Sequence, residues 1–251
     1  MRKISVVIIT YNEDKRIRQT LESVKWCDEI IVVDSCSTDA TVDICRQYAN
    51  CKVYIQPFLG YGLQKRFAVD KASNDWVLSI DADEVLSDAL CYEMKNVLSD
   101  SDITSDGFYI PNTLVFMNKI FNHGAESRCL YLRLFNKIRG NFNVKSLHEV
   151  VQINGTTSVL KNNILHYSYA DIYHYIAKMN NYTSIYANEQ FKKGEYISSL
   201  KSIFRFLFEF IRQYFIKANF LNGYAGFVWS IFSSYYVFVK LIKLYEKNLS
   251  K

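Results

Sequence analysis

Residues 75–84 read DWVLSIDADE, an apolar run that ends in acidic side chains. The run at 76–80 predicts a buried strand, and Asp81 and Asp83 follow at its carboxyl end. Ligands of open α/β sheets bind outside the carboxyl ends of the strands. Neighbouring carboxylates repel each other unless a cation lies between them, and such oxygen ligands suit Mg²⁺ or Mn²⁺. The stretch therefore predicts a divalent-metal site at Asp81 and Asp83, while Glu84 fits the simpler role of capping the strand or starting the next helix.

Upstream of this stretch, strand patterns alternate with helical patterns. Continuous apolar runs are typical of strands that are buried on both faces, and apolar residues at helical spacing are typical of amphipathic helices. The predicted strands cover residues 4–9, 30–33 and 53–55, and the predicted helices cover 14–24, 38–48 and a stretch ending near 71. This alternation predicts a mostly parallel, three-layer α/β/α sheet.

The pattern changes twice further along the chain. Residues 107–116 and 129–135 look extended, which predicts antiparallel strands added to the first sheet. From residue 171 onward the pattern is helical. We expect one domain over residues 1–169, divided into halves at 1–100 and 101–169, and a helical tail over 170–251.

Polar clusters leave the first two predicted strands at the same edge of the sheet. Residues 10–13 read TYNE and residues 34–39 read DSCSTD. Asp34 is suited to accept hydrogen bonds from a ribose or a base, and Tyr11 is suited to stack on a base. Helix-capping turns are the alternative explanation for both clusters. Lys65 follows two glycines and is suited to face a phosphate, although a solvated helix surface would also account for it.

Composition limits the classes of partner and compartment. The formal net charge of +5 suits phosphorylated substrates or an anionic membrane, and we expect no nucleic acid partner. The chain has six cysteines without CxxC spacing, which is typical of reduced thiols and not of a secreted disulfide framework. The apolar run at residues 6–9 is too short for the core of a signal peptide, so we expect a cytoplasmic protein.

Several stretches resemble the nucleotide-binding half of family-2 glycosyltransferases of the GT-A fold. They are SVVIITYNE at 5–13, DEIIVVDSCSTDAT at 28–41 and GYGLQKRFAVDKASNDWVLSIDADE at 60–84. Over its whole length the chain resembles a bacterial group that includes lipopolysaccharide-core glucosyltransferases. The likeness continues in RLFNK at 133–137, LHEVV at 147–151 and HYSY at 166–169.

The resemblance implies an inverting transfer from a nucleotide-diphosphate sugar, aided by Mg²⁺ or Mn²⁺. It assigns residues 1–100 to the nucleotide sugar and 101–169 to the acceptor. Asp81 and Asp83 would hold the metal and the diphosphate. Many members have paired acids after the second strand, whereas this chain has Asp34 followed by Ser35, so the base of the donor stays open. The residues that would contact the nucleoside are Thr10, Tyr11, Glu13 and Asp34.

Displacement at an anomeric carbon requires a base that takes a proton from the attacking hydroxyl. Glu149 is the favoured candidate, since a His-Glu pair before a short apolar run fits the edge of a crevice and the resemblance places an acid there. His148 would orient it. A surface glutamate at the start of an edge strand is the alternative, with Asp88 and Glu126 as further candidates for the base.

Three other side chains have two explanations each. His166 would complete the metal shell or touch the acceptor, but a histidine between apolar residues is also common in protein cores. Arg133 and Arg128 would bind phosphate, or else pair with an acidic side chain inside the protein.

The tail has an amphipathic helical pattern at 197–217 with a mainly basic polar face, followed by an uncharged stretch at 218–239. Helices lying in the membrane interface, helices packed on the catalytic domain and a true membrane span all fit this pattern. The interfacial arrangement agrees with a lipid-linked or oligosaccharide acceptor at the inner leaflet. We therefore expect a peripheral inner-membrane enzyme of lipopolysaccharide or lipooligosaccharide core synthesis. Polyprenyl-phosphate or capsule intermediates are alternative acceptors, and a silent nucleotide-binding scaffold is an alternative function.

Overall fold

The computed structural model describes residues 1–144 and 149–249. The chain divides into two compact units. The first contains Met1–Thr113 and Arg128–His166, and the second contains Leu114–Ser127 and Tyr167–Lys251. Residues 114–127, which the sequence pattern assigns to the first domain, thus group with the helices of the second unit.

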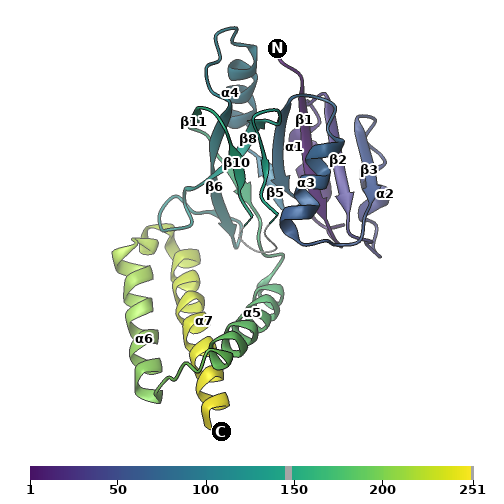
Figure 1. Ribbon diagram of the computed structural model, residues 1–251. Helices are drawn as coiled ribbons and strands as arrows, with labels where there is room; N and C mark the ends of the chain where they lie inside the picture. The colour runs from purple at the N-terminus through teal and green to yellow at the C-terminus, as the bar shows by residue number, and fades with distance from the viewer. Residues whose placement is uncertain (145–148, 250–251) are drawn as a thin grey trace. The chain divides into compact units, whose positions relative to one another are not determined.

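The first unit is built on one large mixed sheet (Figure 1). Its order is β3-β2-β1-β4-β8-β6-β12-β5, with β11 paired to β6, and β9 and β10 form a separate antiparallel pair. The strands are β1 Ile4–Thr10, β2 Glu29–Asp34, β3 Cys51–Ile55, β4 Trp76–Asp81, β5 Glu84–Leu86, β6 Gly107–Phe116, β8 Cys129–Asn136, β9 Gly140–Phe142, β10 Val151–Ile153, β11 Thr157–Val159 and β12 Ile164–His166. The helices are α1 Ile17–Val24, α2 Thr41–Cys45, α3 Tyr61–Lys71 and α4 Asp88–Ser99.

The register of the parallel strands determines which of their residues lie side by side at the carboxyl edge of the sheet. β1 pairs in parallel with both β2 and β4, and β2 pairs in parallel with β3. In this register Thr10 lies opposite Asp34, and Ile9 lies opposite Asp81. The carboxyl ends of β1, β2 and β4 therefore meet at one edge of the sheet, as the sequence pattern predicts.

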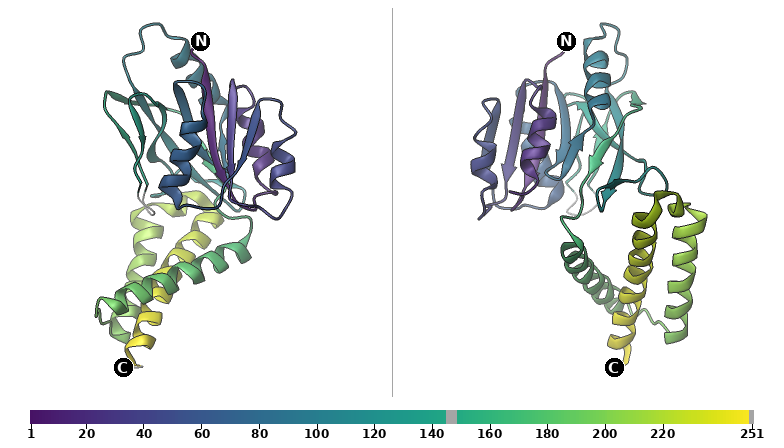
Figure 2. Two further views of the ribbon diagram at one scale, coloured as in Figure 1. Left: turned by 45° about the vertical axis from the view of Figure 1, so that its right-hand side comes forward. Right: turned by 180° about the vertical axis from the view of Figure 1, so that it is seen from behind.

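Alternate side chains of these strands enter two separate cores. Ile4, Val6 and Ile8 of β1 pack in one core with residues of α1, α2 and α4. Val7 of β1 packs in the other core with Ala68 and Val69 of α3. Figure 1 shows α3 in front of the sheet, and the right-hand view of Figure 2 shows α1 on the opposite face. The predicted three-layer α/β/α arrangement with added antiparallel strands is confirmed.

Two short strands were not predictable from their own residues. The sequence leaves open whether Glu84 caps a strand or starts a helix; in the structure it starts β5, which pairs with β12 in antiparallel fashion. The helix α4 begins later, after Ser87, whose hydroxyl accepts a hydrogen bond from the backbone N–H of Leu90. Strands of three residues carry too little pattern to stand out, and their partners are far away in the sequence.

The second unit is mainly helical. Its elements are β7 Lys119–Ile120, α5 Ile172–Lys192, α6 Ser199–Ile211, the π-helical turn η1 Arg212–Ile216, the 3₁₀ turn η2 Asn219–Asn222 and α7 Gly223–Leu249. Its core gathers aromatic side chains around Phe116, whose ring lies 5.3 Å from that of Trp229 and 6.2 Å from that of Tyr175. The end of β6 thereby anchors α5 and α7 in this unit.

Helix α6 has an unusual distribution of burial. Ser202 and Glu209 are its buried residues, whereas Leu200, Phe204 and Leu207 are each more than half exposed. Ser202 and Glu209 are seven positions apart, or two helical turns, so they form a narrow polar seam on the inner face. The wide apolar face of α6 is therefore the outer one.

In the described part of the chain, one stretch is long and apolar enough to cross a membrane by length and composition, namely Asn219–Leu249. Its best window has a mean hydropathy of 1.4, and 39% of that window is buried within the protein. Long core helices of water-soluble proteins meet the same criterion, so this property alone does not distinguish them from a span.

Glu29, at the start of β2, connects three neighbouring segments of the first unit. Its carboxylate accepts hydrogen bonds from the Ser5 hydroxyl at 2.6 Å and from the Ser73 backbone N–H at 2.7 Å, and it pairs with Lys52 at 2.8 Å. Burial alone would raise the pKa of Glu29, but Lys52, Ser5 and Ser73 lower it to about 2. The ionised form therefore stabilises the folded state above the ordinary pKa of 4.5, and this contribution is lost as the pH falls toward 2.

We expect Glu29→Gln to lower the free energy of unfolding by about 2 kcal/mol near neutral pH, because charge-assisted hydrogen bonds become neutral ones. Denaturant unfolding from pH 7 to pH 2 is the measurement, and the difference from the unaltered protein should shrink below about pH 4.5. Glu22→Gln, at an exposed ion pair with Lys25, is the matched control and should have a smaller effect. A Glu29→Gln effect that is independent of pH would contradict this assignment.

Candidate active site

Two loops at the carboxyl edge of the sheet are joined by side-chain hydrogen bonds. The Asn12 backbone N–H donates to the Ser37 hydroxyl at 2.8 Å, and the Thr38 backbone N–H donates to the Asn12 side-chain oxygen at 2.8 Å. Asn12 and Cys36 both have positive φ angles, 53° and 67°, so both loops turn sharply at these positions. The loops after β1 and β2 thus form a single connected surface.

The predicted nucleoside residues lie at the ends of β1 and β2 or in the loop after β1, and their side chains differ in accessibility. Tyr11 is 58% exposed, so its ring is open to a stacking partner. Asp34 is fully buried and its carboxylate accepts hydrogen bonds from the backbone N–H and the hydroxyl of Ser37. Thr10 is also buried, and Glu13 uses its backbone N–H to reach the Thr41 hydroxyl at 2.8 Å. Asp34 therefore holds the turn of its own loop and caps no helix, since α2 begins at Thr41 after Ala40.

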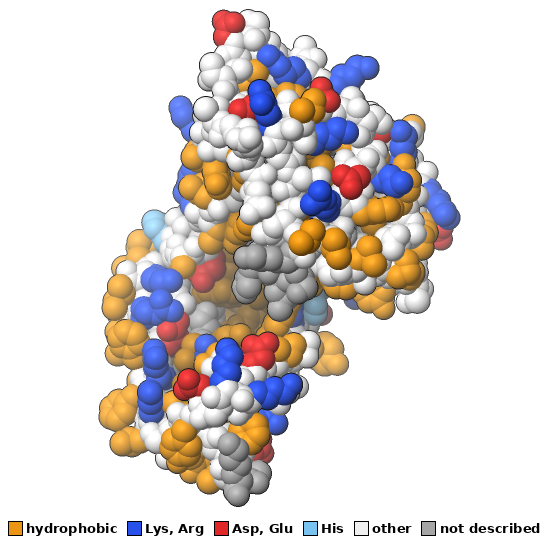
Figure 3. Space-filling model, in the orientation of Figure 1, with side chains coloured by type: hydrophobic (Ala, Val, Ile, Leu, Met, Phe, Trp, Pro, Cys, Tyr) orange, Lys and Arg blue, Asp and Glu red, His pale blue; other side chains and the backbone are white. Residues whose placement is uncertain are grey.

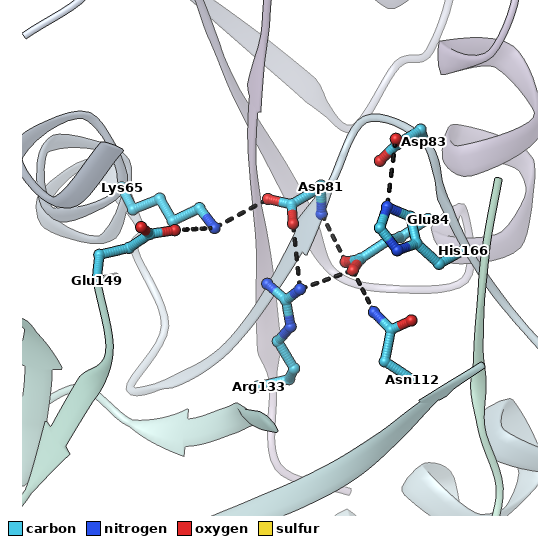
Figure 4. A network of polar contacts seen from close by, with 8 residues as sticks. All are labelled: Lys65, Asp81, Asp83, Glu84, Asn112, Arg133, Glu149 and His166. Atoms are coloured by element: carbon cyan, nitrogen blue, oxygen red, sulfur yellow. Dashed lines mark hydrogen bonds and ion pairs between the residues drawn. The ribbon is translucent and has the colours of Figure 1, made fainter. Parts of the chain in front are cut away.

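Lys65 brings two of the predicted acids together (Figure 4). Its ammonium lies 2.9 Å from a carboxylate oxygen of Asp81 and 2.9 Å from Oε1 of Glu149. The lysine side chain is only 7% exposed, so both contacts lie in a weakly solvated place. Glu149, which is distant in the sequence, therefore lies at the carboxyl end of β4. Its predicted neighbour His148 lies outside the described residues.

Arg133 and Glu84 form a buried ion pair next to Asp81. The guanidinium lies 2.6 Å from Oε1 of Glu84 and 3.1 Å from Oδ2 of Asp81. Glu84 has no exposed surface, and its oxygens also accept hydrogen bonds from the Asn112 side chain and from the Asp81 backbone N–H at 2.8 Å. The internal pairing that the sequence leaves open for Arg133 is thus present, with Glu84 and Asp81 as its partners.

The pKa values in this network follow burial and charge. Burial alone would raise the pKa of Asp81, but Lys65 and Arg133 hold it well below its usual range. Burial raises the pKa of Glu84, although Arg133 opposes that effect. Burial alone would lower the pKa of Lys65, but Asp81 and Glu149 raise it. Asp81 therefore contacts two side-chain cations, and it shares Lys65 with Glu149 and Arg133 with Glu84.

Asp83 lies beside His166 and not beside these cations. Its Oδ2 is 3.3 Å from Nε2 of His166, which stands opposite Glu84 in the pairing of β12 with β5. The two side chains keep 20% and 32% of their surface exposed. Asp81 and Asp83 are thus close in the sequence but belong to different sets of contacts.

Asp83 and His166 are the predicted metal-binding side chains that do not contact Lys65 or Arg133. Within residues 1–144 and 149–249, no group of three or more His, Cys, Asp and Glu side chains is arranged to hold a metal. A site with one carboxylate and one imidazole leaves coordination positions for phosphate oxygens and water, as Mg²⁺ and Mn²⁺ commonly require. The pair is partly exposed, so a ligand can reach it. The metal roles of Asp81, Asp83 and His166 stay predictions.

The remaining predicted residues lie elsewhere or make structural contacts. Asp88 is exposed in the first turn of α4, and Glu126 belongs to the second unit. Arg128 donates to the backbone carbonyl of Lys161 at 3.1 Å. The sequence pattern does not predict Glu84 and Asn112 as members of the network. Their contact depends on the pairing of β5, β6 and β12, which lie far apart in the sequence.

We expect Arg133→Met to lower the free energy of unfolding by about 3 kcal/mol, because Glu84 would lose the cation that compensates its buried charge. Arg139→Met is the matched control, since Arg139 is 60% exposed and lies 3.6 Å from Asp106. That variant should change stability by less than about 1 kcal/mol. Thermal or denaturant unfolding of both variants measures the difference, and equal effects would show that Arg133 does not carry the buried charge.

The chain has relatives among known proteins. The profile of glycosyl transferase family 2 matches residues 5–151. An uncharacterized glycosyltransferase of Rickettsia typhi is 36% identical, with 99% of this chain and 89% of that protein covered. The lipopolysaccharide core biosynthesis glycosyltransferase LpsC of Rhizobium meliloti is 28% identical, with 99% and 94% covered.

Among solved structures, the mannosyltransferase PcManGT of Pyrobaculum calidifontis, determined with GDP-Man and Mn²⁺, has a similar fold. Its TM-score is 0.51 at 15% identity, with 97% of this chain and 87% of that chain covered. The family profile covers more than half of this chain, and the full-length relatives cover nearly all of it. The chain therefore belongs to glycosyl transferase family 2 and is a glycosyltransferase of the GT-A fold.

Proposed function

We propose that this glycosyltransferase moves a sugar, with inversion, from a nucleotide-diphosphate donor to the core of lipopolysaccharide or lipooligosaccharide. The observation that carries the proposal is the contact of Lys65 with both Asp81 and Glu149, each at 2.9 Å. This contact brings the Lys65 ammonium and the Glu149 carboxylate together at the carboxyl edge of the sheet, where open α/β sheets bind their ligands.

The donor would lie across this edge. Tyr11 offers an exposed ring for the base, and the loops after β1 and β2 would enclose the nucleoside. Asp83 and His166 would hold a divalent cation, and a bound cation would neutralise the diphosphate and make it a better leaving group. Mn²⁺ binding is stated for the mannosyltransferase with the related fold, which supports a similar requirement here.

Glu149 would act as the base. In the proposed step the acceptor hydroxyl oxygen forms a bond to the anomeric carbon, the bond from that carbon to the diphosphate breaks, and the hydroxyl proton passes to the Glu149 carboxylate. Lys65 contacts Oε1 of Glu149 at 2.9 Å and would fix the carboxylate in place, leaving Oε2 for the proton. The leaving nucleoside diphosphate carries the electron pair of the broken bond.

Two features support a lipid-linked acceptor at the membrane surface. LpsC, a relative over nearly the whole chain, is described as an enzyme of lipopolysaccharide core biosynthesis. The outer face of α6 carries exposed apolar side chains that would favour burial in the interface of the inner leaflet. The protein would therefore bind to the cytoplasmic face of the inner membrane as a peripheral enzyme.

We expect Glu149→Gln to reduce transfer by about 10²–10⁴-fold while leaving the donor affinity nearly unchanged, since the amide oxygen still accepts from Lys65 but takes up no proton. The measurement is the release of nucleoside diphosphate in the presence of an acceptor glycolipid, together with donor binding by calorimetry. Asp88→Asn, at an exposed acid that was the alternative base, should keep full activity. Full activity of Glu149→Gln would exclude it as the base.

Asp83→Asn should weaken Mn²⁺ binding in the presence of nucleoside diphosphate by at least about tenfold, because the proposed site loses its only carboxylate. Titration of Mn²⁺ followed by electron paramagnetic resonance measures this without any turnover. Asp88→Asn again serves as the control and should bind Mn²⁺ like the unaltered protein. If Asp83→Asn bound Mn²⁺ equally well while Asp81→Asn did not, Asp81 would be the ligand.

A further inference from the structure

The helical unit contains a cavity of about 400 Å³ between α5, α6, η1 and α7. Sites for small molecules commonly enclose roughly 300–1,000 Å³, so the cavity is large enough for a ligand headgroup. Its lining combines charged and apolar side chains. They are Tyr186, Arg205, Phe208, Glu209, Arg212, Val237, Lys240 and Leu241.

The charges of this cavity do not balance. Glu209 is buried and is held by Arg212 in a two-pronged pair, in which Nε donates at 2.8 Å, and by Gln213 at 2.9 Å. Among the described residues, Arg205 and Lys240 form no ion pair. Three cations therefore face one carboxylate, which leaves an excess of two positive charges.

The surroundings of Lys240 disfavour its positive charge. Burial lowers the pKa of its ammonium; Glu209 opposes that effect, and Arg205 adds to it. The ammonium lies 4.7 Å from the centre of the Tyr186 ring, a weak substitute for an anion. A bound anion would relieve the repulsion between Lys240 and Arg205.

The rest of the cavity and its surroundings are apolar. Val237 and Leu241 line it from α7, and Phe208, which is 54% exposed, connects it to the outer apolar face of α6. Figure 3 shows basic side chains next to apolar ones over the helices at the lower left. A free inorganic anion would contact the cations and leave the apolar wall exposed to water. An anion attached to an apolar chain would contact both the cations and the wall.

We propose that this cavity binds the phosphate group of an anionic membrane lipid, with Arg205 and Lys240 contacting the phosphate and Phe208 packing against the start of an acyl chain. This inference adds a lipid site to the proposed membrane association and rests on that association. It concerns the helical unit and does not involve the residues proposed for glycosyl transfer.

The test is flotation of the full-length protein with three kinds of vesicle. One contains phosphatidylcholine alone, one contains added phosphatidylglycerol, and one contains oleate at an equal surface charge. The unaltered protein should prefer phosphatidylglycerol over oleate. The double variant Arg205→Gln/Lys240→Gln should lose this preference and bind phosphatidylglycerol vesicles about thirtyfold more weakly.

Lys192→Gln/Lys193→Gln is the matched control, because it removes the same charge from the exposed end of α5, outside the cavity. It should weaken binding by no more than about threefold, since diffuse attraction is screened by salt. Val237→Phe fills the cavity without changing charge and should also abolish the preference. Equal losses in both double variants, equal binding of oleate and phosphatidylglycerol, or full competition by millimolar inorganic phosphate would each overturn the proposal.

Release of nucleoside diphosphate by the same variants, with a detergent-dispersed acceptor, separates this inference from the proposed function. Variants that lose the lipid preference should still transfer sugar in detergent. An unaltered protein that shows the phosphate-lipid preference but no transfer would refute the proposed function and leave the lipid site intact.

Discussion

The buried pair of Arg133 and Glu84 is the interaction on which the candidate site depends. Glu84 has no exposed surface, so its charge is tolerable only because Arg133, Asn112 and the Asp81 backbone N–H all donate to it. These donors come from β4, β6 and β8, while Glu84 itself begins β5. One carboxylate thus ties together the parallel and antiparallel parts of the sheet, and it fixes where Arg133 and Asp81 lie.

That arrangement gives two neighbouring aspartates different surroundings. Asp81 ends a strand and faces Lys65 and Arg133, whereas Asp83 lies in the turn that follows and faces His166. Both carboxylates of the acidic motif therefore already have partners among the side chains of this protein. The first member of the motif belongs to a network of side-chain charges that reaches Glu149, and the second pairs with His166 outside that network.

Helix α6 differs from the rest of the helical unit, whose core is apolar. Polar side chains such as Ser202 and Glu209 lie inside the packing of α6, while large apolar side chains lie outside. In water this distribution costs free energy, because apolar surface stays hydrated and polar groups lose their hydration. In the interface of a membrane the same distribution becomes favourable. The distribution of burial on α6 thus agrees with a lipid environment.

The sequence by itself determined the layers and the edge at which ligands bind, because continuous apolar runs and helical spacing are local patterns that define strands and helices. It also determined that Asp34 and Asp81 lie near that edge, since each follows a predicted strand. Tertiary structure alone decided the partners of Asp81, the burial of Glu84 and the closeness of Lys65 to Glu149. Those contacts join residues up to 84 positions apart, and only the pairing of strands and packing of helices brings them within hydrogen-bonding distance.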